Sequence, residues 1–200
     1  MTAARVVVVA GPSGAGKSRL TRRLGLPALN LDDFYKNGDD PTLPCLELTG
    51  GDPITDWDDP ASWNAADAVA TITALCRTGA AQVPTYDIAT SRRTGTTTLQ
   101  LDGAHFLVAE GIFAQEVVAV CRRLGLLADA VCVTQHPLVT FVRRLSRDLR
   151  EHRKPPFYLL RRGLHLALAQ RKVVARAVEQ GCRVVSGDQA YAELTRLWRA

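Results

Sequence analysis

The sequence predicts an α/β fold built on a doubly wound parallel sheet. Three observations predict it. Short apolar segments typical of buried strands alternate along the chain with helix-like segments. The first strand-like segment is followed at once by a glycine-rich turn and a helix. The composition, with 46% hydrophobic and 22% charged residues in a chain of 200, is that of a globular domain. Strands that alternate with helices form parallel sheets, because each helix returns the chain to the same end of the sheet.

The first part of the chain contains a strand, a helix and a second strand. Residues 5–10 include four successive valines, which is typical of a parallel strand buried on both faces. Residues 17–24 are predicted to form the next helix, and Gly25 is a residue type that commonly ends helices. Residues 28–31 are predicted to form a second, short strand.

A long polar segment, residues 33–60, follows the second strand. It contains repeated turn signals such as Gly50-Gly51-Asp52-Pro53. A loop of this length inside a compact domain usually has a functional role. We expect Asp59-Pro60 to open a helix that runs to about Cys76 and ends at Gly79.

A hairpin arm is predicted over about residues 83–102. Its expected strands are residues 83–86 and 96–102, of which the second is rich in β-branched residues. Its expected turn is the polar segment 90–95. The rest of the chain continues the alternation, with predicted strands at 105–109, 128–133 and 183–185 and predicted helices at 114–124, 137–150, 157–179 and 190–198. We expect one domain over residues 1–200, with the arm and a basic lid at about 143–156 as appendages.

Composition narrows the classes of function. The net charge of +5 and the pI near 9.2 suit either a nucleic-acid partner or a polyanionic small molecule such as ATP. No CxxC pair and no zinc-finger spacing occurs, so free thiols in a reducing, cytoplasmic compartment are expected. No segment is long and apolar enough to predict a signal peptide or a membrane partner. The five cysteines are Cys45, Cys76, Cys121, Cys132 and Cys182.

A phosphate-binding motif lies between the first strand and the first helix. It reads Gly11-Pro12-Ser13-Gly14-Ala15-Gly16-Lys17-Ser18 and matches the P-loop pattern G-x-x-x-x-G-K-S. Glycines let backbone N–H groups turn toward phosphates, and the helix N-terminus adds partial positive charge. We expect Lys17 to contact the β- and γ-phosphates of ATP and Ser18 to ligate Mg²⁺. A chance glycine-rich turn is the alternative, which the strand–turn–helix context disfavours. The fold class is therefore of the P-loop NTPase type, and the expected nucleotide-binding residues are Gly11, Ser13, Gly14, Ala15, Gly16, Lys17 and Ser18.

Carboxylates follow two of the predicted core strands. Asp32 and Asp33 come after residues 28–31, and Glu110 comes after residues 105–109. In open α/β sheets ligands bind beyond the carboxyl ends of the strands. A kinase needs one carboxylate to take the proton of the acceptor hydroxyl, and oxygen ligands to hold magnesium. The alternatives are a helix cap or turn pair for the two aspartates and a surface turn residue for the glutamate.

A basic stripe is predicted on one face of a helix near residue 147. Its members recur at spacings near three and four, and we expect them to form a lid over ATP. One alternative is a solvated face with Asp148 and Glu151 as ion-pair partners. Another is an RNA-binding stripe, which the absence of interleaved aromatic residues disfavours. The members are Arg143, Arg144, Arg147, Arg150, Arg153 and Lys154.

Five ordered segments together resemble the uridine kinase family of P-loop nucleoside kinases. Besides the P-loop, Asp32-Asp33-Phe34-Tyr35 is similar to the family's D-S-F-Y, and Trp57-Asp58-Asp59-Pro60 to the end of its N-F-D-H-P. Pro84-Thr85-Tyr86-Asp87-Ile88 is similar to its P-x-Y-D-F arm, and Val108-Ala109-Glu110-Gly111-Ile112 to its L-x-E-G-I. The start of the family's lid resembles Arg143-Arg144-Leu145-Ser146-Arg147-Asp148.

The resemblance implies roles for these residues. Asp32 would be the general base on the acceptor hydroxyl, and the magnesium set would be Ser18, Asp32 and Glu110. The lid arginines would be Arg144 and Arg147, which with Lys17 and Asp32 make the expected catalytic set. The expected acceptor-binding residues are Tyr35, Trp57, Asp58, Tyr86 and Ser91. Of these, Asp58 would bind the ribose, and Trp57 and Tyr86 would lie beside the sugar or base.

Two segments depart from the family pattern. Ser91 stands where the family has a histidine that reads the pyrimidine edge. The lid continues Glu151-His152-Arg153-Lys154 where the family has E-R-G-R. We still expect phosphoryl transfer with both changes. The change at Ser91 leaves open which base the protein recognises.

The leading hypothesis is an ATP-dependent kinase that phosphorylates the 5′-hydroxyl of uridine or cytidine. A rival within the same class is a kinase for a sugar phosphate, pantothenate or a modified nucleoside. A second class is an ATP-binding regulatory protein, and a third is an inactive family member. We expect ATP and Mg²⁺ as cofactors and a small-molecule acceptor, without a nucleic-acid or membrane partner. Kinases of this family are often oligomers, so a homo-oligomer is a further expectation.

Overall fold

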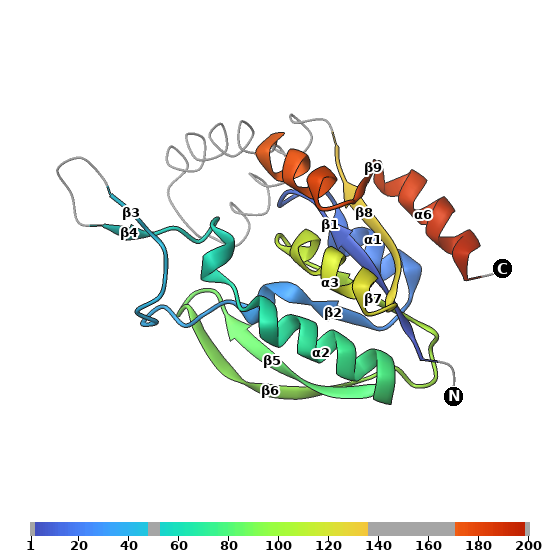
Figure 1. Ribbon diagram of the computed structural model, residues 1–200, viewed down its shortest axis with the longest axis horizontal. Coiled ribbons are helices and arrows are strands. Elements are labelled where there is room, and N and C mark those ends of the chain that lie inside the picture. Colours follow the sequence, from blue (N-terminus) through green and yellow to red (C-terminus); the bar gives the residue numbers. More distant parts are fainter. Residues whose placement is uncertain (1–2, 48–52, 136–170, 199–200) are drawn as a thin grey trace.

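The computed structural model describes residues 3–47, 53–135 and 171–198, and its centre is a five-stranded parallel sheet (Figure 1). The strands lie in the order β2-β7-β1-β8-β9. Their bounds are Ala28–Asn30 for β2, Phe106–Glu110 for β7, Arg5–Ala10 for β1, Leu127–Val133 for β8 and Arg183–Val185 for β9.

The valine run of β1 occupies the middle of this sheet. β1 pairs in parallel with β7 on one side and β8 on the other. Val6 and Val8 face one core cluster, whereas Val7 and Val9 face another. All four valines are fully buried because both faces of the strand are covered.

Helices cover both faces of the sheet, as the doubly wound fold requires. The face of Val7 and Val9 is covered by α1 (Lys17–Leu24) and α6 (Gly187–Leu197). The opposite face is covered by α2 (Ala65–Thr78), α3 (Val118–Arg123) and the helical residues 171–179. The predicted α/β fold with a doubly wound parallel sheet is therefore confirmed.

The path of the chain through the sheet creates a binding position at the end of β1. The chain passes from β1 to the outer strand β2, returns to β7 between them, and then crosses to β8 on the other side. Ligands bind at such a reversal of strand order, beyond the carboxyl ends of the strands. In the register of the sheet, Glu110 lies beside Val9 of β1 and beside Asn30 of β2. The P-loop, Asp32 and Glu110 are thus brought to one edge.

The prediction of a helix that starts at Asp59-Pro60 is wrong for the residues before Ala65. A short 3₁₀ helix, η2 (Pro60–Ser62), ends before α2 begins. Between them, Trp63 is extended and pairs with Tyr35 in an isolated bridge. Asn64 N–H donates a hydrogen bond of 2.9 Å to the carbonyl of Phe34. This pairing with a distant segment interrupts the helix, and propensity cannot reveal it.

The hairpin arm is confirmed, with longer strands and a shorter turn than predicted. Its strands are β5 (Ala80–Asp87) and β6 (Arg92–Gln100), so residues 92–95 belong to a strand. The turn is confined to four residues because the Asp87 carboxylate accepts hydrogen bonds from Ala89 N–H and the Thr90 hydroxyl. Such side-chain bonds to the next residues are typical of aspartate at tight turns.

Smaller differences lie at the ends of other elements. Leu31, predicted as the end of a strand, begins the 3₁₀ helix η1 (Leu31–Phe34), which Asn30 caps by accepting from Asp32 N–H. The predicted helix 114–124 starts as 3₁₀ helix η3 (Ala114–Val117) and continues as α3. A small antiparallel pair, β3 (Cys45–Leu46) and β4 (Ile54–Thr55), was not predicted. The predicted helix 137–150, most of the predicted helix 157–179 and the lid at 143–156 lie outside the described residues.

Two expectations drawn from composition can be compared with the structure. All five cysteines are free thiols, and four of them are buried. Burial raises the pKa of the Cys76 and Cys121 thiols to about 11, which keeps them protonated and unreactive near neutral pH. Within the described residues, no helix has the length and apolar character needed to cross a bilayer.

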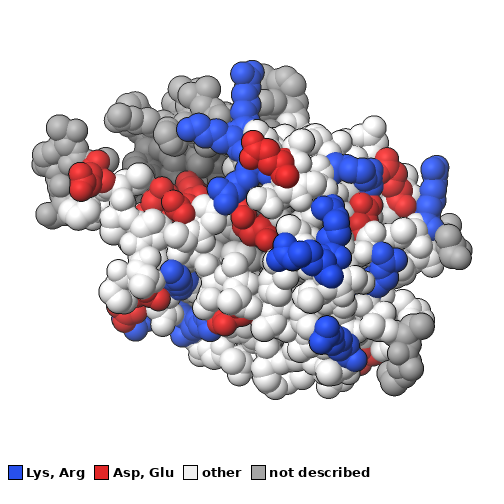
Figure 2. Space-filling view, viewed as in Figure 1, with Lys and Arg blue, Asp and Glu red and all other residues white. Residues whose placement is uncertain are grey.

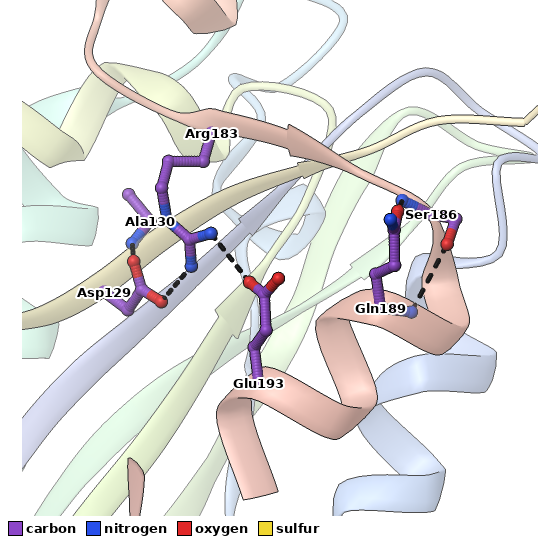
Figure 3. A network of polar contacts seen from close by, with 6 residues as sticks. All are labelled: Asp129, Ala130, Arg183, Ser186, Gln189 and Glu193. Carbon is purple, nitrogen blue, oxygen red and sulfur yellow. Dashed lines mark hydrogen bonds and ion pairs between the residues drawn. The ribbon is translucent and has the colours of Figure 1, made fainter. Parts of the chain in front are cut away.

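An ion-pair network joins the edge strand β9 to the neighbouring strand β8 and to α6 (Figure 3). The Arg183 guanidinium contacts Asp129 at 2.6 Å and Glu193 at 2.7 Å, so it links β9 to β8 and α6. The Asp129 carboxylate also accepts a hydrogen bond from Ala130 N–H. Next to this network, Ser186 and Gln189 form a reciprocal capping box at the start of α6.

Replacing Arg183 by methionine is expected to lower the free energy of unfolding by about 1 kcal/mol. The substitution keeps an apolar stem and removes two ion pairs, one of them to the Asp129 side chain, which is only 24% exposed. The measurement is urea unfolding followed by circular dichroism. The matched control is Arg123→Met, because Arg123 is exposed and has no ion pair among the described residues. Equal unfolding free energies for the two variants would assign the network no role in stability.

Candidate functional site

The loop between β1 and α1 has the backbone shape of a phosphate cradle. Gly11 has a φ of 137°, and a Cβ there would lie 2.3 Å from the carbonyl oxygen of Val133. Gly14 and Gly16 also have positive φ values, of 80° and 100°. Only glycine adopts such conformations without strain, and the close approach to Val133 leaves no room for a side chain. The glycines predicted to form the cradle are therefore needed by its geometry.

Lys17 is the first residue of α1 and lies over this loop. Its side chain is buried, and Nζ donates hydrogen bonds to the carbonyl oxygens of Gly11 at 2.8 Å and Pro12 at 3.3 Å. The ammonium group is thus held across the mouth of the cradle by the loop itself. A cation in this position offsets the negative charge of a bound polyphosphate.

Ser18 and Glu110 meet at the same edge of the sheet. The Ser18 hydroxyl donates a hydrogen bond of 3.2 Å to a Glu110 carboxylate oxygen. Burial raises the pKa of Glu110, while the bond from Ser18 and the nearby charge of Lys17 act in the opposite direction. A half-buried carboxylate whose ionised form gains from a nearby cation is suited to bind a divalent metal.

Asp32 lies directly beside this pair. Its Oδ1 accepts a hydrogen bond of 2.9 Å from Ile112 N–H, two residues after Glu110. A Cβ on Gly111 would lie 2.9 Å from the same oxygen, so the close packing of η1 on the end of β7 depends on glycine there. Ser18, Asp32 and Glu110, which were predicted as one magnesium set, are thus brought together.

The oxygen atoms of Ser18, Asp32 and Glu110 fit magnesium better than a metal ion that takes all of its ligands from the protein. Among the described residues, no group of three or more His, Cys, Asp or Glu side chains is spaced to hold a metal ion. Magnesium keeps several waters and is usually bound by one or two carboxylates together with substrate phosphates. One hydroxyl and two carboxylates beside a phosphate cradle match that preference.

A cluster of aromatic rings is centred on Tyr35, three residues after Asp32. The Tyr35 ring is 5.8 Å from Trp57, 5.9 Å from Tyr86 and 5.8 Å from Phe113, measured between centroids. Four separate segments of the chain therefore contribute to one apolar wall. Phe113 was not predicted as a site residue, and its only signal in the sequence is its place just after Glu110-Gly111-Ile112.

The phenol groups of this cluster bond to the backbone. The Tyr35 hydroxyl donates to the Trp57 carbonyl at 3.2 Å, and the Tyr86 hydroxyl donates to the Lys36 carbonyl at 3.0 Å. Burial raises the pKa of both phenols, and for Tyr35 the charges of Asp32 and Asp58 add to the effect. Asp32 and Asp58 therefore both lie near Tyr35.

Asp33 is part of this arrangement in a way that the sequence did not indicate. Burial and the neighbouring charge of Asp32 raise the pKa of Asp33, whereas hydrogen bonds from the Asn30 side chain and the Tyr86 backbone lower it. The Asp33 carboxylate therefore connects η1 to β5. Sequence reasoning had placed it only beside Asp32 as a second carboxylate.

The sequence is similar to that of a known kinase. This chain is 31% identical over 158 residues to the uridine kinase of Deinococcus deserti, and the match covers 76% of this chain and 72% of that protein. This chain belongs to the uridine kinase family. It is therefore a P-loop kinase by family, in agreement with the cradle and with the predicted resemblance.

Other similarities concern the fold or part of the chain. A solved structure assigned as a fructose transport system kinase from Silicibacter sp. TM1040 superposes with a TM-score of 0.63. That superposition covers 94% of this chain and 89% of the other at 16% identity, so the likeness is one of fold alone. The inorganic pyrophosphatase TTM1 of Arabidopsis thaliana is 29% identical over 164 residues, which cover 76% of this chain and 22% of that protein. No family model matches the chain.

Ser91, which stands at the position of the family's histidine, lies at the end of the hairpin turn of this kinase. Its φ is 51°, in the left-handed region. Its carbonyl accepts a hydrogen bond of 2.7 Å from Gly38 N–H, and its side chain bonds to the Tyr86 phenol. Ser91 is thus brought next to the aromatic cluster, with its polar groups already engaged.

The predicted lid arginines cannot be placed in the site. Arg143, Arg144 and Arg147 lie outside the described residues, as do the remaining members of the basic stripe. Their roles therefore stay predictions that follow from the resemblance to the family.

Proposed function

We propose that this chain transfers the γ-phosphate of ATP, with Mg²⁺, to the 5′-hydroxyl of a nucleoside, with uridine and cytidine as the leading acceptors. The observation that carries the proposal is the position of Asp32. This carboxylate is anchored to the backbone beside Glu110 and lies near the Tyr35 phenol. It therefore stands between the phosphate cradle and the aromatic cluster, where a general base of phosphoryl transfer is needed.

The residues of the cradle hold the donor. Backbone N–H groups of residues 11–18 and the Lys17 ammonium bind the phosphates, while Ser18, Asp32 and Glu110 supply oxygens to Mg²⁺. The metal, when bound, neutralises charge on the phosphates. The pre-set shape of the loop and the buried Lys17 mean that little reorganisation is needed when the reaction occurs.

The acceptor hydroxyl is deprotonated as it attacks. Asp32 orients the hydroxyl and takes its proton while the new oxygen–phosphorus bond forms. The bond from the γ-phosphorus to the bridging oxygen of ADP breaks, and the electron pair stays on ADP. The products are ADP, a nucleoside monophosphate and a proton. Arg144 and Arg147 belong to this proposal as groups that offset charge on the transferring phosphoryl group.

The charges around the aromatic cluster favour a neutral acceptor over the anionic rivals. Asp32, Asp33 and Asp58 all lie on this side of the site. Lys36, the residue after Tyr35, donates a hydrogen bond to the Thr42 hydroxyl. The exposed arginines of the arm pair with carboxylates, Arg92 with Asp39 and Arg93 with Asp67. A sugar phosphate or pantothenate would therefore meet three carboxylates on this side of the site.

On one face of the described residues, the charge distribution also favours a small-molecule acceptor over a nucleic-acid partner. On the face drawn in Figure 2, basic side chains are interspersed with acidic ones. A nucleic-acid interface usually gathers Lys and Arg into one stripe or patch. The face drawn therefore does not have the charge pattern of a nucleic-acid interface.

The test is release of ADP from Mg-ATP by the purified chain with a panel of acceptors. The panel contains uridine, cytidine, adenosine, a ribose phosphate and pantothenate, together with a sample that lacks acceptor. We expect release that depends on uridine or cytidine and is weak with both anionic acceptors. Release that depends only on an anionic acceptor would replace the proposed substrate, and release independent of any acceptor would contradict the kinase assignment.

Replacing Ser91 by histidine is expected to sharpen the preference for pyrimidines. An imidazole at this position can hydrogen-bond to a base edge, and histidine tolerates the left-handed backbone of residue 91 better than most residues. One such bond should raise kcat/KM for uridine relative to adenosine about tenfold. The measurement is competition between the two nucleosides, with Ser91→Ala as the control. An unchanged acceptor profile would show that the arm does not read the base.

A further inference from the structure

The tip of the hairpin arm is fastened to the segment that follows η1. Residues 36–39 contact residues 86–93 through one ion pair and three hydrogen bonds of 3.0 Å or less. The contacts are Tyr86 hydroxyl to Lys36 carbonyl, Gly38 N–H to Ser91 carbonyl, Arg93 N–H to Asn37 Oδ1, and Arg92 to Asp39. The segment also follows Asp32 and Tyr35 directly, so the arm and the acceptor side of the site are joined there.

A bulge in the arm makes the position of Tyr86 depend on Arg93. Thr85 pairs with Gly95, but the next residue, Tyr86, pairs with Arg93, so Thr94 is an extra residue in β6. Such bulges bend a strand and redirect the side chains beside them, and they are common next to active sites. The backbone of Arg93 therefore sets where the Tyr86 ring meets Tyr35.

The side chain of Asn37 binds the backbone of Arg93. Its Oδ1 accepts the hydrogen bond from Arg93 N–H at 2.8 Å. The Arg93 side chain points to a different element, since it pairs with Asp67 of α2 at 3.1 Å. Among the contacts of the arm tip, this bond joins a half-buried side chain to the backbone of the residue that pairs with Tyr86 in the hairpin.

We infer that Asn37 is a positioning residue for the acceptor: it holds the bulged arm so that Tyr86 completes the aromatic wall beside Asp32. The inference rests on the proposed function, because it assigns this wall to the acceptor. Asn37 touches neither phosphate donor nor acceptor in this scheme and acts through Arg93 and Tyr86. Its loss should therefore weaken acceptor binding and leave the phosphate cradle unaffected.

The test compares Asn37→Ala with Asn37→Asp, which keeps an oxygen able to accept from Arg93 N–H. The control is Gln82→Ala, because Gln82 Nε2 donates a 2.8 Å bond to Thr98 nearer the other end of the same hairpin. We expect KM for the acceptor to rise about tenfold in Asn37→Ala, the effect of one lost hydrogen bond, with KM for ATP unchanged. Asn37→Asp and Gln82→Ala should stay near the wild-type value.

Hydrogen–deuterium exchange of residues 86–93 supplies a readout that does not require activity. Exchange in this segment should be faster in Asn37→Ala than in wild type, Asn37→Asp or Gln82→Ala. Unchanged exchange in Asn37→Ala would overturn the inference whether or not the chain transfers phosphate. Faster exchange with an unchanged KM for the acceptor would overturn it as well. A wild-type chain that phosphorylates no acceptor would instead contradict the proposed function, and the exchange result would still decide whether Asn37 holds the arm.

Discussion

Replacing Lys17 by alanine is expected to lower kcat/KM about 10³-fold, a loss typical of removing one pre-organised group that stabilises transition-state charge. The Lys17 ammonium is buried and bonded to the carbonyls of Gly11 and Pro12, so it is held where the β- and γ-phosphates are expected. Its loss leaves charge on the transferring group without an offset. The measurement is steady-state ADP release with saturating nucleoside and varied ATP.

The fold of this variant must be checked separately, because Lys17 also contributes hydrogen bonds to the loop. Circular dichroism and the midpoint of thermal unfolding serve this purpose. A second variant, Lys17→Met, keeps the apolar stem and removes only the charge and its donors. Near-normal turnover in a folded Lys17→Met protein would show that the cradle is not the donor site.

The second large effect is expected for Asp32→Asn. General-base catalysis contributes about 10²–10⁴-fold, so kcat should fall by about 10³-fold. Asparagine keeps an oxygen that can accept the bond from Ile112 N–H, so the packing of η1 on β7 should survive. Because the proposed main role of Asp32 concerns the acceptor hydroxyl, KM for ATP should change much less than kcat.

Asp33→Asn is the matched control for this experiment. Asp33 is the adjacent carboxylate on the same 3₁₀ helix, but its hydrogen bonds go to Asn30 and to the Tyr86 backbone. We expect less than a tenfold change in kcat, because amide and carboxylate oxygens can both accept the backbone bond. Comparable losses in the two variants, or a loss of ATP affinity in Asp32→Asn with turnover retained, would contradict the general-base role and leave Asp32 with a structural or metal-binding role alone.

Much of the fold could be predicted because it depends on local patterns. The valines of β1 mark a strand that is buried on both faces, and the alternation of strands with helices implies a parallel sheet. Element ends were less predictable. The helix expected from residue 59 begins only at Ala65, since Trp63 pairs with Tyr35 and Asn64 with Phe34. Those partners come from a distant part of the chain that propensity does not include.

The aromatic cluster proposed to bind the acceptor shows the same contrast between local patterns and contacts of distant segments. Tyr35, Trp57 and Tyr86 were predicted from separate motifs, whereas the contact of Tyr35 with Phe113 was not. Nothing in the sequence near Asn37 indicates that its side chain binds the backbone of Arg93. That bond joins residues 56 positions apart and depends on a bulge, which has no reliable signature in a single sequence.

The sequence by itself determined the phosphate cradle, because glycine, lysine and serine at these spacings have local conformational and chemical requirements. It also determined the parallel sheet through the periodicity of its apolar residues. Only the tertiary structure decided that Ser18 meets Glu110, 92 positions away, and that Asp32 packs against Gly111 beside them. It likewise decided that the arm is fixed through Asn37. The physical reason is that contacts between distant segments depend on strand order and close packing, which are properties of the whole fold.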